Sequence, residues 1–381
     1  MSGGYDLILL GGRLFDPGAG LDRVADIAFR DGVIAGIGDY SRSEAARVLD
    51  AAGLLVTPGL IDVHCHLYPY TDMGIGEANC FTAGVTAAAD AGSLGWGNFA
   101  SMRGHAGGVR LREYFYLNIS ADGIPVSNFC EQVDPDFDGG AAARAFRRIW
   151  RDRPAHLLGL KLRMQRNITR DLGLRPLEWA LAMCEELGTH LVVHCTDPAV
   201  PLADILTRMR PGDIVTHIYN GLGDTILDPD GHLIPELLAA RERGVLFDCG
   251  NDRIHFAYKV ALPALEQGFY PDFIGSDLTT NAAFGPICTS FSQLLSKWLA
   301  LGMPLDTLIE KVTRRAAVEL GMAGKIGTLT PGAFGDAALL KLEEGSYRYP
   351  DSYGGSLTGS VRLRPVATAL EGKLVWCDPD Y

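Results

Sequence analysis

The pattern of apolar and polar positions predicts a β-rich segment at the start of the chain. Short apolar runs within residues 5–58 are separated by turn residues, and Pro58 ends the series. The clearest case is Asp31-Gly32, which lies between the apolar runs 26–29 and 33–38. An Asp-Gly pair in that setting predicts a β-hairpin. A β-segment of this size is marginal alone, so we expect it to have a partner elsewhere in the chain.

From residue 59 onward, apolar strands alternate with helix-like stretches. Each predicted strand is a nearly continuous apolar run, as expected for a parallel strand buried on both faces. The predicted strands are residues 60–65, 84–89, 114–119, 157–162, 190–195, 213–217, 245–249 and 272–276. The predicted helices are residues 141–151, 177–187, 202–209, 234–243, 260–267 and 304–320. About eight strands alternating with helices predict an α/β fold, a TIM-type (β/α)8 barrel.

The last part of the chain returns to β-type patterning. The turn-rich segment 327–332 precedes predicted strands at residues 336–341 and 366–376. Residues 345–360, rich in Gly, Ser and Tyr, are a predicted loop. This tail is the expected partner of the first segment. The expected domains are a small β-sandwich formed by both chain termini and the barrel between them, at residues 1–58 with 322–381 and at residues 59–321.

Composition narrows the classes of partner. The chain has 381 residues, is 47% hydrophobic, and carries a formal net charge of -12 with a pI of about 5.2. An acidic surface argues against nucleic acid or an anionic membrane as partner, because both bind basic patches. No apolar run reaches the roughly 18 residues of a membrane span, and residues 1–6 lack the features of a signal peptide. The eight cysteines form no CxxC pair, so we expect a cytoplasmic protein without disulfides.

Ionisable side chains stand at the ends of the predicted barrel strands. His64 and His66 end the first strand at a spacing of two, so their side chains face the same way and can hold one metal ion. The further residues at strand ends are Lys161, His194, His217 and Asp277. In a barrel the carboxyl ends of the strands meet at one rim, where active sites lie. Each residue alone also has a structural explanation, but together they predict a shared metal site.

The donor types of this set fit zinc or a similar divalent ion, which binds imidazole and carboxylate. Four histidines and one carboxylate exceed the three protein ligands usual for one catalytic zinc, which indicates two ions with a bridging hydroxide. A charged ammonium on Lys161 would be repelled by two cations. Lys161 therefore belongs to the site only as a neutral amine or as a carbamate, an anionic ligand with two oxygens. The alternative is that its stem extends from the strand end to solvent.

Taken in chain order, this set resembles the binuclear subtype of the amidohydrolase superfamily. The set is His-x-His after the first strand, a lysine on the fourth, a histidine on each of the fifth and sixth, and an aspartate on the eighth. The run Gly327-x-Leu-x-Pro331-Gly332-x-x-Gly335-Asp336 is similar to that superfamily too. Within it the chain looks most like the dihydroorotase-like amidohydrolase/deacetylase group, through segments such as Asp90-Ala91-Gly92-Ser93 and Gly159-Leu160-Lys161-Leu162-Arg163.

The resemblance implies a role for each residue of the set. The implied ligands of a buried ion are His64, His66 and Asp277, and those of an exposed ion are His194 and His217. Carboxylated Lys161 would bridge the two ions. The implied metal is Zn²⁺. Asp277 would also move a proton from the bridging hydroxide to the leaving group. The implied reaction is hydrolysis of an acyl bond, amide or ester, in an N-acyl amino acid or O-acyl 2-hydroxy acid.

Three other functions remain open. The first is a cyclic amidase of the dihydroorotase or hydantoinase type, which uses the same metals. The second, a mononuclear deaminase, is disfavoured because its site does not call for a lysine on the fourth strand. The third is a metal-binding scaffold without activity, against which the presence of Asp277 argues.

Four further residues are candidate substrate contacts. Arg163 lies two residues after Lys161, so a continuing strand directs it towards the barrel mouth, where its guanidinium can clamp a substrate carboxylate. The alternative is a surface arginine. Tyr68, Asn118 and Asn220 are weaker candidates, and Tyr68 is equally well explained as an aromatic ring under a loop. The expected partner is a small molecule carrying a carboxylate, and family analogy alone implies a homo-oligomer.

The segment after the seventh predicted strand departs from the pattern of the group. The group tends to carry Gly-His-Gly there, whereas this chain has Gly250-Asn251-Asp252-Arg253-Ile254-His255. We expect this loop to face the pocket and to affect substrate choice. His255 could reach the barrel mouth from this loop, but we interpret it as a water-exposed histidine at a helix start. No role is assigned to the remaining histidines, His105, His156, His190 and His232.

Overall fold

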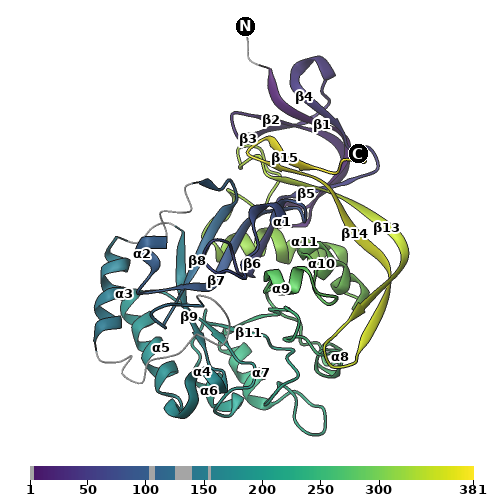
Figure 1. Cartoon of the computed structure of the whole chain (residues 1–381). Coiled ribbons are helices and arrows are strands. Elements are labelled where there is room, and N and C mark those ends of the chain that lie inside the picture. The colour runs from purple at the N-terminus through teal and green to yellow at the C-terminus, as the bar shows by residue number, and fades with distance from the viewer. Residues whose placement is uncertain (1–3, 103–107, 125–139, 153–155) are drawn as a thin grey trace.

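The computed structural model describes residues 4–102, 108–124, 140–152 and 156–381. These residues form two sheets, one of eight strands and one of seven. Figure 1 shows the eight-stranded sheet, with both chain ends, beside a larger body of strands surrounded by helices. None of the described helices combines the length and the apolar character needed to cross a membrane.

Both ends of the chain contribute to the eight-stranded sheet, which confirms the predicted small β-domain. Its strands are β1 (Tyr5–Asp16), β2 (Leu21–Arg30), β3 (Val33–Gly38), β4 (Ala45–Asp50), β5 (Leu55–Pro58), β13 (Ala337–Pro350), β14 (Ser356–Leu370) and β15 (Lys373–Cys377). Strand β5 joins the two halves, because it pairs with β1 on one side and β13 on the other. The predicted hairpin at Asp31-Gly32 is formed by β2 and β3. Apolar residues such as Leu7, Val56 and Leu339 form the core of this domain.

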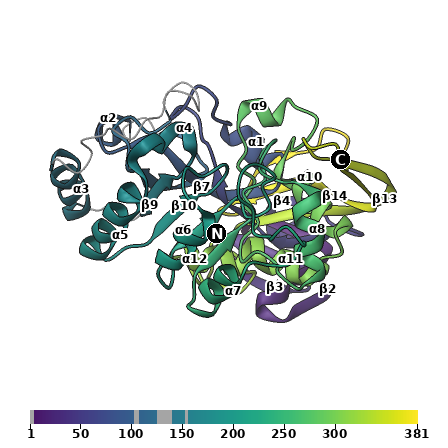
Figure 2. The same ribbon diagram turned by 90° about the horizontal axis from the view of Figure 1, so that it is seen from below.

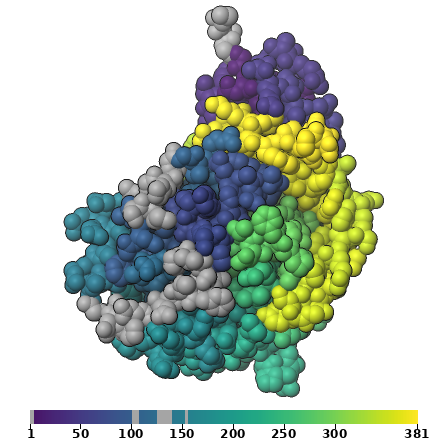
Figure 3. All heavy atoms as spheres, viewed as in Figure 1, coloured from purple at the N-terminus to yellow at the C-terminus, as the bar shows by residue number. Residues whose placement is uncertain are grey.

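The prediction of a loop at residues 345–360 is wrong. Strands β13 and β14 continue as an antiparallel pair out to Pro350 and Ser356, so only residues 351–355 form the turn. The outer half of this hairpin has few buried positions, so its sequence lacks the apolar alternation that marks a strand. The predicted strand 366–376 is likewise split into the end of β14 and β15. Figure 3 shows the hairpin, in yellow, along the outside of the green segments of the barrel.

The other sheet consists of parallel strands that follow one another in chain order. They are β6 (Leu60–Cys65), β7 (Val85–Gly95), β8 (Arg112–Asn118), β9 (Leu157–Arg163), β10 (Leu191–His194), β11 (Ile214–Thr216) and β12 (Leu246–Asp248). Each lies at one of the predicted positions. Inside the ring, apolar side chains such as Val63, Val192 and Phe273 form a cluster. The sheet therefore has the parallel, TIM-like barrel architecture that the sequence predicts.

The eighth predicted strand, residues 272–276, is not a regular strand. This segment and the residues just after it still close the ring, through isolated parallel bridges from Phe273 to Asp248 and from Leu278 to Cys65. Side-chain carboxylates accept hydrogen bonds from two of its backbone N–H groups. Gly275 N donates to Asp248 Oδ1 (2.8 Å) and Ser276 N donates to Asp62 Oδ1 (3.1 Å). These bonds replace the backbone bonds of a continuous ladder.

Helices cover the outside of the barrel. The described helices are α1 (Glu77–Phe81), α2 (Phe99–Met102), α3 (Ala141–Arg151), α4 (Arg166–Thr169), α5 (Arg175–Leu187), α6 (Leu202–Arg208), α7 (Pro235–Glu242), α8 (Tyr258–Glu266), α9 (Thr280–Ala283), α10 (Phe291–Ala300), α11 (Leu305–Glu310) and α12 (Ala316–Glu319). Figures 1 and 2 both place α3 and α5 on the outer side of the strands. The predicted helix 304–320 is formed by α11, a π-helical turn and α12.

Candidate metal centre

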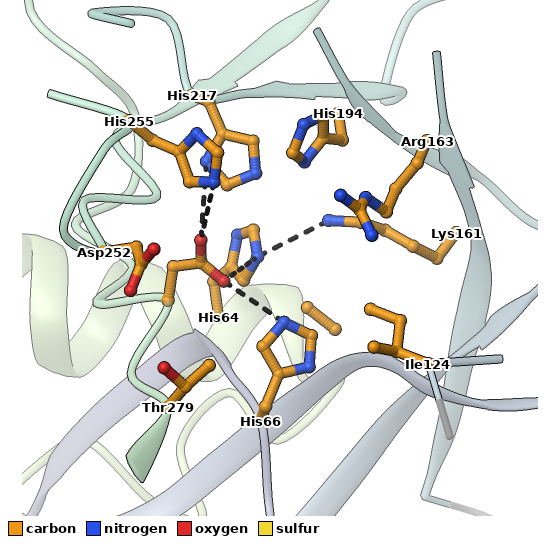
Figure 4. Close-up of a pocket in the computed structure, with 12 residues that line it drawn as sticks. His64, His66, Ile124, Lys161, Arg163, His194, His217, Asp252, His255 and Thr279 are labelled. Carbon is orange, nitrogen blue, oxygen red and sulfur yellow. Dashed lines mark hydrogen bonds and ion pairs between the residues drawn. The ribbon is translucent and has the colours of Figure 1, made fainter. Parts of the chain in front are cut away.

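One pocket at the carboxyl ends of the barrel strands collects the predicted ligands (Figure 4). It is lined by His64, His66, Ala91, Ile124, Lys161, Arg163, His194, His217, Asp252, His255, Asp277 and Thr279. The structure thus brings together all six residues predicted as ligands, and Arg163 with them. Figure 4 shows the imidazoles of His66, His194, His217 and His255 turned towards a common space.

The two histidines of the first strand lie side by side, as their spacing predicts. His64 Nε2 and His66 Nε2 lie 3.3 and 3.2 Å from the same oxygen, Asp277 Oδ1. Their Nδ1 atoms are held from behind, by Asp248 Oδ2 at 2.7 Å and by Ser93 Oγ at 2.9 Å. Such outer hydrogen bonds orient metal-binding histidines and set which nitrogen faces the ion. Both rings therefore present Nε2 to the pocket.

Lys161 is only 1% exposed, so its stem does not extend to solvent and that alternative is wrong. Its Nζ lies 3.4 Å from His64 Nε2. Gly92 makes room for this side chain, because a Cβ at residue 92 would lie 2.7 Å from Lys161 Cγ. Gly92 also has φ +93°, a conformation that favours glycine. Gly92 therefore leaves the space in which the Lys161 side chain lies among the imidazoles.

His194 and His217 form the opposite side of the pocket, with their ring centroids 4.2 Å apart. His217 Nδ1 donates to the carbonyl of Gly250 at 2.7 Å. His194 Nε2 is buried and has no hydrogen-bond partner among the described residues. Burial, reinforced by neighbouring positive groups, lowers the pKa of both imidazoles well below the usual value. Both rings are therefore neutral, the form that binds a metal.

Asp277 lies between the two groups of histidines. Its Oδ1 faces His64 and His66, and its Oδ2 lies 3.9 Å from His217 Nδ1. Its backbone adopts φ +54°, and its N–H donates to the carbonyl of His64 at 2.6 Å. Burial alone would raise the pKa of Asp277, but the surrounding histidines outweigh burial and lower it well below the usual value. The carboxylate is therefore ionised and available as a ligand or proton acceptor.

Two further pocket residues, Asp252 and His255, come from the loop after β12 (residues 249–257, the β12 loop). The interpretation of His255 as water-exposed is wrong, because its side chain is buried beside His217 with 4.1 Å between ring centroids. Asp252 is also buried, and its Oδ1 has no hydrogen-bond partner among the described residues. Burial, followed by the charge of Asp277, raises the pKa of Asp252 to about 7. The only sequence signal for these residues was the departure of the loop from the family pattern.

The predicted substrate contacts lie in different surroundings. Arg163 is buried in the pocket wall, and its Nη2 donates to Gln165 Oε1 at 2.5 Å. Asn118 and Asn220 are buried and bond backbone groups, Asn118 to Gly92 O and Asn220 to His217 O. Tyr68 is 62% exposed and is not among the residues that line the pocket.

The remaining histidines and the cysteines bring no further described residue to this pocket. Of the four histidines without an assigned role, His105 lies outside the described residues, and the other three do not line the pocket. The seven cysteines in the described part of the chain are free thiols, whereas Cys130 lies outside it.

The donor set fits divalent metal ions. Three triads of potential ligand atoms have all their members within 4.8 Å of one another. They are His64 with His217 and Asp277, His194 with His217 and His255, and Asp252 with His255 and Asp277. Imidazole nitrogen and carboxylate oxygen are the donors that zinc and similar ions take in catalytic sites. The unpartnered, buried Nε2 of His194 is a donor atom that an ion would satisfy.

Comparison with known proteins agrees with this geometry. The chain is 28% identical to a deacetylase of Agrobacterium fabrum over 334 residues, which cover 85% of this chain and 80% of that protein. It is 27% identical to a deacetylase of Enterococcus faecalis over 382 residues, covering 97% and 99% of the two chains. A crystal structure described as a dihydroorotase superposes with a TM-score of 0.87 at 26% identity, covering 98% of both chains.

The strand order, the convergence of ligands and the similarity over most of the chain point the same way. The family model described as "Amidohydrolase family" matches residues 55–371, well over half of the chain. The resemblance found in the sequence is therefore confirmed, and this protein belongs to the amidohydrolase family of hydrolases.

Proposed function

We propose that this protein is a metal-dependent hydrolase that cleaves an acyl bond of a small carboxylate substrate. The substrates we infer are N-acyl amino acids or O-acyl 2-hydroxy acids, which yield a carboxylic acid and an amine or alcohol. The observation that carries the proposal is the position of Asp277, whose two oxygens face two different groups of imidazoles. Similarity to proteins named deacetylases along most of the chain supports the acyl substrate.

The residues present would hold two ions. His64, His66 and Asp277 would bind the buried ion, and His194 and His217 the exposed ion. Carboxylated Lys161 would supply the anionic bridge. Zn²⁺ is the ion we infer, because zinc binds imidazole nitrogen well. When bound, such a pair lowers the pKa of coordinated water and polarises an acyl carbonyl.

Asp277 is the group that handles the proton. Its carboxylate is ionised and its Oδ2 faces His217 and His255, so it can accept a proton on that side of the pocket. It can then donate the proton to the departing nitrogen or oxygen, a general acid/base role that typically contributes about 10²–10⁴-fold to the rate. Burial of the pocket keeps bulk water from competing for this proton.

Arg163 would orient the substrate. Its guanidinium lies in the pocket wall near Lys161, where a carboxylate on the substrate would find a cation with fixed geometry. The apolar side chains of Ala91 and Ile124 line the same pocket and leave room for a small side chain or acyl group.

A panel of substrates tests this proposal. Purified enzyme would be assayed with N-acetyl amino acids, O-acetyl 2-hydroxy acids, dihydroorotate and hydantoins, before and after removal of metal by a chelator. We expect turnover of at least one linear acyl substrate, its loss with the metal, and its return on addition of Zn²⁺. Full activity without metal would contradict the proposal.

The second candidate is a cyclic amidase. The structural similarity to a protein described as a dihydroorotase, at a TM-score of 0.87, favours it. Turnover of dihydroorotate or a hydantoin, with no turnover of any linear acyl compound, would establish this alternative instead.

A further inference from the structure

The β12 loop places a fifth imidazole in the metal pocket. His255 lies on the same side as the ligands of the exposed ion, with its ring centroid 4.1 Å from that of His217 and 5.0 Å from that of His194. These three histidines present ligand atoms that all lie within 4.8 Å of one another. The side chain is 5% exposed, so it points inward rather than to solvent.

The ring of His255 is held in the way that the other pocket histidines are held. Its Nδ1 lies 2.8 Å from Thr196 Oγ1, which leaves Nε2 on the pocket side. His255 Nε2 is 3.6 Å from Asp277 Oδ2. His64 and His66 show the same arrangement, each with Nδ1 bonded to an oxygen outside the pocket and Nε2 facing Asp277. An oxygen partner on Nδ1 is the usual second contact of a histidine whose Nε2 binds a metal.

The loop is fixed from two directions, so the position of His255 is not left to a free segment. The turn of the β13–β14 hairpin reaches it, with Tyr353 Oη donating to Ile254 O at 2.6 Å and Ser352 Oγ donating to Arg253 O at 2.5 Å. From α10, the buried Lys297 donates to Asn251 Oδ1 at 2.9 Å. A side chain held this firmly is pre-organised to bind.

We propose that His255 is a third imidazole ligand of the exposed ion, beside His194 and His217. This inference rests on the proposed function, because it assumes that two ions bind in this pocket. It gives the exposed ion three neutral nitrogen donors in addition to the carboxylated Lys161. The β12 loop then contributes to metal retention and not only to the choice of substrate.

Metal titration of variants tests this assignment. Apo-protein would be titrated with Zn²⁺ in competition with a chromophoric chelator, and bound metal measured by inductively coupled plasma mass spectrometry. We expect His255→Ala to bind one ion as the wild type does and the other about 100-fold more weakly. His232→Ala is the matched control, because the His232 side chain is 73% exposed and is not among the residues that line the pocket. It should bind both ions like the wild type.

Two further measurements keep the assignment testable if His255→Ala does not fold. X-ray absorption at the zinc edge of the wild-type protein counts imidazoles, and five per two ions are expected. Thr196→Val removes the hydroxyl that orients His255, and we expect about 10-fold weaker binding of one ion. A count of four imidazoles, or unchanged zinc affinity in both variants, would overturn the role of His255. A wild-type protein that is active without bound metal would overturn the proposed function itself, so the two failures are distinguishable.

Discussion

The metal pocket has two walls that are built in different ways. One wall is made by regular strands, with His64 on β6, His66 directly after its end, and Lys161 on β9. The other is made by the β12 loop, which brings in Asp252 and His255 without regular secondary structure. The strand wall takes its geometry from alternation along a paired strand. The loop wall takes its geometry from contacts to the hairpin, to α10 and to the segment after residue 272.

This difference separates the pocket features that relatives can share from those that are specific to this chain. Strand positions are held by a ladder of backbone hydrogen bonds, which tolerates many sequences, so the ligand order can recur throughout a family. Loop positions depend on particular side chains such as Lys297 and Tyr353. We therefore expect changes in the strand wall to abolish the chemistry, and changes in the loop wall to weaken or redirect it.

The largest effect should come from Lys161 in the strand wall. Lys161→Ala removes the bridging group, so bound metal should fall from two ions to one or none and activity by about 10⁴-fold or more. Metal analysis of the purified variant, together with the acyl hydrolysis assay, measures both. Retention of two ions at wild-type affinity would show that Lys161 does not bridge them.

The second largest effect is expected at Asp277, which we propose both binds metal and carries the proton. Asp277→Asn keeps an oxygen donor but cannot accept the proton, so turnover should fall by about 10²–10⁴-fold while metal content stays largely intact. Steady-state kinetics on fully metallated protein would check this. Unchanged turnover would remove Asp277 as the proton carrier.

Lys297 tests the loop wall through stability. Burial lowers its pKa to about 8, whereas Cys249, Cys288 and Asp351, the charged or titratable groups that face it, act in the opposite direction. The unfolded state therefore binds more protons than the folded state between about pH 8 and pH 10.5, and stability rises with pH in that window. At lower pH the buried charge costs about 3 kcal/mol.

The Lys297→Met variant has no ionisable side chain at this position, so it lacks this pH dependence of stability. Relative to the variant, the wild type should gain about 2 kcal/mol of unfolding free energy between about pH 7.5 and pH 9.5. Urea denaturation at several pH values measures the difference. A difference that stays constant over this range would mean that Lys297 keeps an ordinary pKa. The thiols of Cys249 and Cys288, whose pKa burial raises, are present in both proteins, so their titration cancels in this difference.

A smaller effect is expected at the hairpin turn. Tyr353→Phe leaves the carbonyl of Ile254 without its donor, which costs about 1–3 kcal/mol locally and should lower kcat/KM by about 10-fold. Tyr347→Phe on the same hairpin is the control, because its hydroxyl bonds only Glu344 O among the described partners. Faster hydrogen exchange in residues 249–257 of the first variant alone would locate the effect. Equal kinetics in both variants would disconnect the hairpin from the site.

The smallest effect is expected at Tyr68, which is 62% exposed and outside the pocket lining. Tyr68→Phe should change kcat/KM by less than about twofold, because an exposed hydroxyl contributes little. A tenfold loss would restore the prediction that Tyr68 contacts the substrate.

The amino-acid sequence by itself determined the fold class and the strand wall of the pocket. The apolar runs and their alternation with helices identify the barrel strands. Residues at the carboxyl ends of parallel strands all lie at the same rim, so the sequence predicts that His64, His66, Lys161, His194 and His217 meet there. The hairpin at residues 345–360 could not be predicted, because its strands are largely exposed in this outer half and their sequences lack apolar alternation.

Only the tertiary structure decided the loop wall. The burial of His255 depends on Thr196, Lys297 and Tyr353, which lie from about 40 to about 100 residues away in the chain and meet the loop only after folding. A loop has no period from which the direction of a side chain can be read. Its geometry is set by distant partners, so it becomes visible only when the barrel and the hairpin have closed around it.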